Sequence, residues 1–354
     1  MSFFGAMLGG LVGTKVLVGL PASRVGVLLA SSGLLAAVVS YGLGPQHVIA
    51  LLICLVVIQL IQVIDVANTM QQIEIRIVPA SRVQAHARHQ LTMTLVALAA
   101  PLAAAIAAQT ISVHAVFLLV IVYIVAFFHW MSLGSAHIEA KQLVAPRFGF
   151  GDLLAHAPLR RLTTFRLLTA CAHSATLVAI PLLAARVASA HTAGVVQSIF
   201  LLAVALGFAA GHWQGTRWRS SSPPSFVLIW IGCIGSSAAW IAVALTGSIA
   251  LGIIACAAHG FALYCLRMAG VLVGRLVTPT TVFGQAVLIG DTISRFGSAL
   301  VGVSVSMFLI RLNSGEPRLL LVGGLALIAA SAVLVAGRLW RDIPRDSPPF
   351  TRTN

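Results

Sequence analysis

The sequence predicts an all-α, polytopic membrane protein made of two pseudo-symmetric helical bundles, with about 10–11 transmembrane helices. The first observation is composition: 59% of the 354 residues are hydrophobic, 8% are charged and the mean hydropathy is +1.01. A soluble domain of this length could not bury so much apolar surface. The second is that the apolar residues form continuous runs of span length, which favours helices over the alternating strands of a membrane barrel. The third is an internal repeat.

A short polar turn led by Arg and carrying Pro occurs twice, as Arg76-Ile-Val-Pro-Ala-Ser-Arg-Val-Gln-Ala and as Arg275-Leu-Val-Thr-Pro-Thr-Thr-Val-Phe-Gly-Gln-Ala. The two copies begin 199 residues apart, and each lies between long apolar runs. Gly13-Thr14-Lys15 and Gly215-Thr216-Arg217 end two other apolar runs at a similar offset. Two matches in one register indicate duplicated halves, and duplicated membrane halves are typical of transporters.

The apolar runs place the spans in order. A short N-terminal run, 1–13, is followed by ten runs long enough to cross a bilayer. These lie at 25–43, 48–70, 91–110, 113–133, 164–186, 194–214, 226–246, 248–272, 283–310 and 318–338. We therefore expect an incomplete N-terminal bundle at 1–135, a cytoplasmic linker at 136–163, and a C-terminal bundle with a cytoplasmic tail at 164–354. Subtracting the repeat offset from the start of the second half gives a position before Met1, so the first helix of the first half is expected to be missing. Either the true start lies upstream or the chain is naturally truncated.

Most of the 22 Lys and Arg residues lie in alternate connections, including the linker and the tail. By the positive-inside rule these connections and the C-terminus face the cytoplasm, which predicts a multi-pass protein of the cell inner membrane. In the linker, Leu and Arg residues alternate between Leu153 and Arg166, a pattern that suits a helix lying on the inner leaflet. The net charge of +14 could suggest nucleic acid, but the cations are spread singly among apolar runs, so no nucleic-acid partner is expected.

No cofactor or metal is expected. The five cysteines lie in apolar runs without ligand spacing. His129, His173 and His259 fall in or near spans, but each lacks a carboxylate or Cys at the spacing of metal ligands.

Polar groups at membrane depth are the candidates for function, because a charge there costs several kcal/mol. Asp65 lies inside the run at 48–70, and Asn68 follows it by nearly one helical turn. Asp65 is a candidate proton carrier; the alternative is a structural carboxylate bonded to nearby Asn or Gln groups. Arg267 matches Asn68 at the repeat offset and could bind an anionic substrate or pair with Asp65; the alternative is that it snorkels to the inner surface.

Asp291 and Arg295 are four residues apart, so they can form an intramembrane ion pair on one helical face. A structural pair and a transport site are both open interpretations of these two residues.

The layout resembles the major facilitator superfamily: two helical halves, a basic cytoplasmic link, and short basic turns at matching positions. In that family the turn after helices two and eight typically has the pattern Gly-x-x-x-Asp-Arg. Here Gly10-Leu-Val-Gly-Thr14-Lys15 and Gly211-His-Trp-Gln-Gly-Thr216-Arg217 keep the glycine and the cation but have Thr in place of Asp. Ala99-Ala100-Pro101 keeps the proline of the family's antiporter pattern and replaces its glycines.

The resemblance implies a secondary active transporter, not an enzyme, with a small-molecule substrate, protons and membrane lipids as partners. It suggests proton-coupled efflux of a small amphiphilic molecule such as a drug or siderophore, with Arg76, Arg275 and the two Gly-Thr-cation turns as conformational elements. It also places Asp65 and Arg267 on cavity-lining helices, where we expect them to face one another. The alternative is a truncated, non-transporting paralogue that acts as a binding or interaction protein, which the missing helix and the two threonines favour. An intramembrane enzyme is a more distant alternative, because no Ser/His/Asp or metal constellation is present.

Overall fold

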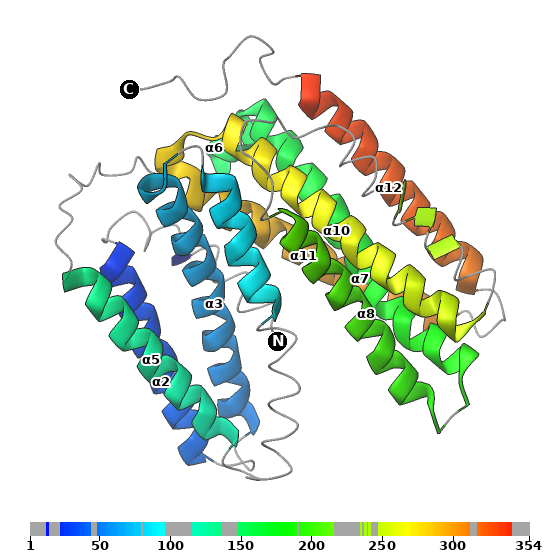
Figure 1. Cartoon of the computed structure of the whole chain (residues 1–354), viewed down its shortest axis with the longest axis horizontal. Coiled ribbons are helices and arrows are strands. Elements are labelled where there is room, and N and C mark those ends of the chain that lie inside the picture. Colours follow the sequence, from blue (N-terminus) through cyan, green and yellow to red (C-terminus); the bar gives the residue numbers. More distant parts are fainter. Residues whose placement is uncertain are drawn as a thin grey trace. The chain divides into compact units, whose positions relative to one another are not determined.

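The fold is all-α throughout the described chain (Figure 1). The computed structural model describes residues 12–13, 22–43, 48–78, 81–95, 115–135, 148–189, 191–215, 234–235, 237–238, 240–241, 247–311 and 317–341. The helices are α2 (Ala22–Leu43), α3 (Val48–Arg76), α5 (Ala115–Ser135), α6 (Phe150–Ala155), α7 (Ala157–Val187), α8 (Ala193–Gly215), α10 (Ile249–Val277), α11 (Phe283–Arg311) and α12 (Pro317–Arg341). Residues 82–95 are also helical, and the short 3-10 helix η3 (Thr280–Val282) precedes α11.

The positions of the helices confirm the all-α membrane architecture. Five helices among the described residues are long and apolar enough to cross a membrane: Leu52–Arg76, Ala157–Val187, Ala193–Gln214, Ile249–Val277 and Thr280–Ser304. Shorter apolar helices lie at Arg24–Val39, Val120–His129 and Leu327–Arg338. Most of the span expected at 226–246, and the part of the span at 91–110 beyond residue 95, lie outside the described residues.

Two helices are longer than the apolar runs that predict them. α3 continues to Arg76, so its 29 residues extend about 43 Å and include the polar residues that follow the predicted span. α7 starts at Ala157, with a Pro in its first turn, inside the segment expected to be the linker. The linker helix expected on the membrane surface is therefore divided: α6 has six residues, and the rest belongs to α7.

Each repeated turn contains a backbone hydrogen bond that spans three residues. In the first, the Ser81 amide donates to the Val78 carbonyl at 2.9 Å; in the second, the Val282 amide donates to the Pro279 carbonyl at 3.1 Å. The two bonds lie 201 residues apart, so they are not at equivalent positions of the 199-residue repeat. The superposition of the two halves remains a prediction.

The chain divides into two compact units. Unit 1 contains Met1–Arg76, Ala99–Leu153 and Thr278–Ile293; unit 2 contains Ile77–Leu98, Leu154–Val277 and Ser294–Asn354. The segment that follows each repeated turn thus belongs to the unit that is otherwise formed mainly by the other half of the chain. The boundaries at 135 and 164 expected from sequence remain a prediction.

In unit 1, α2 packs against both α3 and α5 (Figure 1). Val25 and Leu29 of α2 pack with Ile61 and Ile64 of α3, and Tyr123 of α5 joins them. The Tyr123 ring lies over Gly33, where any Cβ atom would collide with it. Glycine at 33 therefore allows α5 to approach α2 closely.

In unit 2, α8 and α10 touch backbone to backbone. A Cβ atom at Gly207 would collide with the Ala257 carbonyl group, and one at Gly260 with the Val204 carbonyl group. Gly211, four residues after Gly207, accommodates the Tyr264 ring in the same way. Small residues at this spacing let membrane helices approach closely, because association in lipid depends on packing rather than on the hydrophobic effect.

Candidate functional site

α3 carries a polar stripe along one side. Five polar residues fall within roughly 80° of one another around the helix axis. They are Gln62, Asp65, Thr69, Gln72 and Arg76, and none of them is buried. The exposed isoleucines of the same helix are Ile49 (77%), Ile53 (59%) and Ile75 (53%). These isoleucines centre roughly 140° away from the polar stripe. Their side suits lipid along the first part of α3, whereas near the end of the helix Gln71, in the same direction as Ile53, contacts the start of α11. The polar side suits an aqueous space.

Asp65 is the only acidic residue on this stripe. It is half-buried, and its Oδ1 atom is buried without a hydrogen-bond partner among the described residues. Tyr123 of α5, whose ring lies over Gly33, is near Asp65. Asn68, expected beside Asp65, is instead buried at 2% exposure. The three-residue offset moves Asn68 roughly 60° around the helix and away from the stripe.

The extension of α3 beyond residue 70 contains two polar residues that the sequence interpretation missed. Gln71 Nε2 donates to the Thr280 carbonyl at 2.7 Å, and Gln71 Oε1 accepts a short hydrogen bond from the Gly284 amide. Glu74 is buried, with 2% of its surface exposed. The cluster of polar residues after position 70 had indicated the end of a span, whereas here these side chains pack inside unit 1.

Arg267 lies on the side of α10 that is opposite its exposed apolar stripe. Ile249, the first residue of this helix, is exposed (38%); the other exposed large apolar residues are Leu251, Ile254, Phe261 and Leu276, which fall within roughly 80° of one another. Arg267 follows Ile254 by 13 residues, which places it roughly 140° around the helix axis. Leu266 and Met268 beside it are buried, but Arg267 itself is exposed. Arg267 is therefore exposed on the side of α10 that is opposite most of the exposed apolar residues, which we call the interior side; snorkelling and substrate binding both remain open for this residue.

Aromatic side chains surround Arg267 in unit 2. Its guanidinium carbon lies 5.8 Å from the centre of the Phe208 ring, within the range of a cation–π contact. Phe208 packs edge-on against His212 with ring centres 4.5 Å apart, and His212 packs against Tyr264 at 4.8 Å. Both ring nitrogens of His212 and the Tyr264 hydroxyl are buried without hydrogen-bond partners among the described residues.

Three histidines on three different elements lie near Arg267 in unit 2. They are His89 of the helix at 82–95, His173 of α7 and His212 of α8. His173 stacks on His259 of α10 with ring centres 6.3 Å apart. Among the described residues, no group of three or more His, Cys, Asp or Glu is arranged to hold a metal ion. The cluster thus combines the fixed charge of Arg267 with aromatic and imidazole rings, and sequence analysis found only single members of it.

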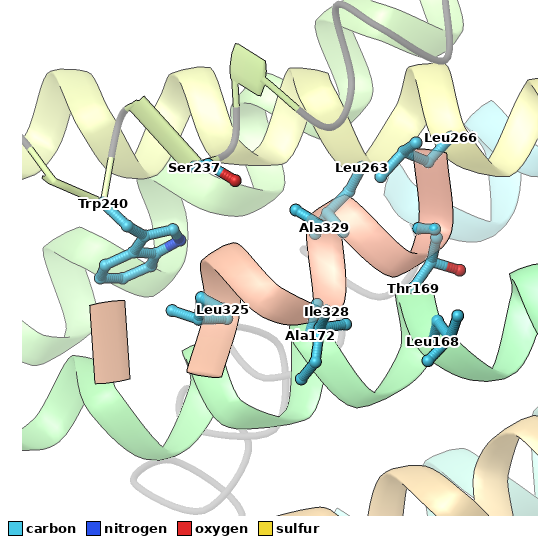
Figure 2. A pocket seen from close by; sticks show the side chains of 11 residues that line it. Leu168, Thr169, Ala172, Ser237, Trp240, Leu263, Leu266, Leu325, Ile328 and Ala329 are labelled. Atoms are coloured by element: carbon cyan, nitrogen blue, oxygen red, sulfur yellow. The ribbon is translucent and has the colours of Figure 1, made fainter. Parts of the chain in front are cut away.

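A small cavity lies beside this cluster, between α7, α10 and α12 (Figure 2). Its volume is about 20 Å³, enough for about one water molecule. Leu and Ala residues form most of its wall, and the polar atoms of Ser237, Trp240 and Thr169 are its few polar groups (Figure 2). Trp240 also packs against His259, with ring centres 5.4 Å apart. The cavity is too small to be the substrate site.

The remaining predicted residues are placed as follows. A Cβ atom at Gly13 would lie 2.7 Å from Leu288 Cδ2 and 2.8 Å from Ile64 Cγ1, so this glycine is at a close helix contact. Arg76 and Gly215 are the last residues of α3 and α8, and Arg275 lies in the last turn of α10. Thr14, Lys15, Thr216, Arg217 and Pro101 lie outside the described residues.

Asp291 and Arg295 both lie on α11, where Asp291 is half-buried and Arg295 is exposed. Their ion pair remains a prediction, as does the pairing of Asp65 with Arg267.

No family model matches the sequence, and no curated protein matches it either. Solved transporter structures match nearly the whole chain. A fucose:proton symporter of E. coli gives a TM-score of 0.69 at 14% identity, over 95% of this chain and 88% of that one. A bacterial homologue of the iron transporter ferroportin in an outward-facing state gives 0.69 at 15% identity, over 96% and 88%.

The proton:xylose symporter XylE of the major facilitator superfamily, bound to 6-bromo-6-deoxy-D-glucose, gives a TM-score of 0.67 at 14% identity, over 97% of this chain and 84% of that one. All three are transporters, and the match extends over both halves of the chain. This chain has the fold of the major facilitator superfamily.

Proposed function

We propose that this chain is a secondary active transporter that couples proton movement to the efflux of a small amphiphilic molecule across the cell inner membrane. The fold likeness to proton symporters over almost the whole chain supports the transporter class. The observation that carries the proposal is Asp65, a carboxylate with a buried Oδ1 atom on the polar stripe of an apolar helix.

Asp65 is the residue to which we assign the coupling proton. A charged side chain in the hydrocarbon region costs several kcal/mol, so an acid at this depth is a functional candidate by default. Gln62, Thr69 and Gln72 extend the stripe on either side of Asp65 and provide polar surface along which water or substrate can approach.

The test is transport by the full chain in proteoliposomes, with carboxyfluorescein as an anionic amphiphilic probe and ethidium as a cationic one. Asp65→Asn should abolish efflux driven by an imposed pH gradient, while exchange of probe against probe continues, because exchange needs no net proton movement. Asp152→Asn is the matched control. Asp152 is exposed on α6, where it accepts a hydrogen bond from the Gly149 amide at 2.7 Å.

Two results would contradict the proposal. If Asp65→Asn responds to the pH gradient as the unmodified protein does, the carboxylate is structural. If the unmodified chain binds a probe but moves neither probe under any gradient, the binding-protein alternative is favoured. The cytoplasmic position of the C-terminus and the outward direction of transport belong to the same proposal and are tested by vesicle orientation in this assay.

A further inference from the structure

The acidic residues of this chain are distributed unevenly. Between Asp152 and Asp291 there is no Asp or Glu, and there is none between Glu74 and Glu139. The helix at 82–95, α7, α8 and α10 fall entirely within these two intervals. All four belong mainly to unit 2, so the described interior of unit 2 contains basic side chains and no carboxylate.

Arg267 is the cation of this region. It is exposed on the interior side of α10, and imidazole rings from three other elements, those of His89, His173 and His212, lie near it. A guanidinium remains charged at any physiological pH and presents five donors in one plane. None of these four helices contributes an Asp or Glu, so the fixed charge that α10 presents at this point is the guanidinium, which attracts an anion.

Apolar aromatic surface lies directly beside the charge. The Phe208 ring is 5.8 Å from the guanidinium carbon and packs against His212, which in turn packs against Tyr264. A ligand that places an acidic group on Arg267 would therefore bring its adjacent atoms against the half-buried Phe208 ring, which packs on the buried His212. An inorganic anion would leave that ring unused.

We propose that the interior side of α10 binds an organic anion, with a carboxylate, sulfonate or phosphonate group on Arg267 and an apolar body against Phe208. This inference rests on the proposed transport function in one respect, that the bound anion is the transported substrate. It adds the charge and shape of that substrate. Arg267 provides charge-assisted hydrogen bonds, which are stronger than neutral ones. Phe208 provides apolar contact area and does not discriminate between charged and neutral head groups.

The test is equilibrium binding to the purified full chain in nanodiscs, using probes with one shared naphthalene body. The anionic probes are 2-naphthoate, naphthalene-2-sulfonate and 2-naphthylphosphonate; 2-naphthamide is neutral, and 2-naphthylmethylammonium is cationic. At least one anion should bind roughly ten- to hundredfold more tightly than the amide, the range expected for charge-assisted hydrogen bonds. The ammonium should bind no better than the amide.

Three variants locate the site. Arg267→Gln should abolish the preference for the anion, and Arg267→Lys should keep part of it because the charge remains but the planar donor set is lost. Phe208→Leu should weaken the anion and the amide by the same factor. Arg186→Gln is the matched control: it removes a positive charge from the exposed end of α7 and should leave the preference unchanged.

The inference is overturned if no anion binds better than the amide, or if Arg267→Gln and Arg186→Gln have equal effects. Failure of the proposed function gives a different pattern. An anion preference that depends on Arg267, in a chain that moves no probe in proteoliposomes, supports the binding site and rejects transport. Transport of ethidium by a chain that shows no anion preference supports transport and rejects the anion site.

Discussion

The start of α11 is capped by a side chain from another helix, and this predicts a local loss of stability when the cap is removed. Gly284 is the second residue of α11, so its amide is one of the four at a helix N-terminus that have no carbonyl partner within the helix. Gln71 of α3 accepts a hydrogen bond from that amide and donates to the Thr280 carbonyl. The substitution Gln71→Leu keeps the size of the side chain and removes both bonds.

The expected cost follows from the number of bonds and the burial of the amide. A hydrogen bond contributes about 0.5–1.5 kcal/mol, so two bonds correspond to about 1–3 kcal/mol. Gly284 is buried and packs against Gln71 and Ala67, so water cannot easily replace its lost acceptor, whereas the bond from Gln71 to the Thr280 carbonyl is exposed and contributes less. Amides in the first turns of α11 should then exchange with deuterium roughly 5- to 150-fold faster.

Hydrogen exchange measured by mass spectrometry on peptides covering residues 280–295 is the assay. Gln72→Leu is the matched control, because Gln72 has the same chemistry one position further along, and the described structure gives it no side-chain hydrogen bond. Peptides from α7 should exchange at the same rate in both variants. Equal exchange of residues 280–295 in the two variants would refute the capping role of Gln71.

Two further predictions concern packing and topology. Gly207→Leu should prevent close packing of α8 on α10, at a cost of about 1–3 kcal/mol or more, because the new side chain meets the Ala257 backbone. The variant should lose its monodisperse peak in size-exclusion chromatography. The control Gly194→Leu places the side chain in open space and should elute normally. A Cys at Ser347 should react with a membrane-impermeant maleimide in inside-out vesicles but not in intact cells; labelling in intact cells would invert the orientation. The native cysteines that the structure describes, Cys54, Cys171, Cys256 and Cys265, are buried, and a Cys233→Ser background removes the fifth.

Hydropathy predicted the helices well because a span must contain about 20 apolar residues in sequence, and this constraint is local. It failed at the ends, where helices continue past the hydrocarbon region. α3 extends to Arg76 because Gln71 hydrogen-bonds to the Thr280 carbonyl and Glu74 is buried. α7 begins at Ala157 because Leu159 and Leu162 in its first turns are buried, Leu162 within an apolar cluster. Contacts of this kind join residues far apart in the chain, and no local pattern reports them.

The candidate site was predictable only residue by residue. Asp65 and Arg267 are conspicuous in sequence because charge is rare in apolar runs. The side of the helix on which each residue lies could not be assigned until exposed apolar residues marked the opposite side. His212 was missed altogether because a histidine near the end of a span resembles an interfacial residue. Its importance comes from Phe208 and Tyr264, one of which lies on another helix.

The two repeated turns organise both units in the same way but with different chemistry. In unit 1, the helix after the second turn is held by Gln71 of α3, the helix that precedes the first turn. In unit 2, the helix after the first turn packs on α10, the helix that precedes the second turn, through Val83 and Ala87.

At the repeat offset of 199, Gln71 corresponds to Gly270, which has no side chain to act as a cap. Its carbonyl instead accepts a hydrogen bond from Arg166 of α7 at 3.3 Å. The contact in unit 2 therefore depends on distributed apolar packing, whereas the contact in unit 1 depends on one amide side chain. Because apolar packing spreads its free energy over many atoms while the cap concentrates it in two hydrogen bonds, a single polar substitution should affect unit 1 more than any equivalent change in unit 2.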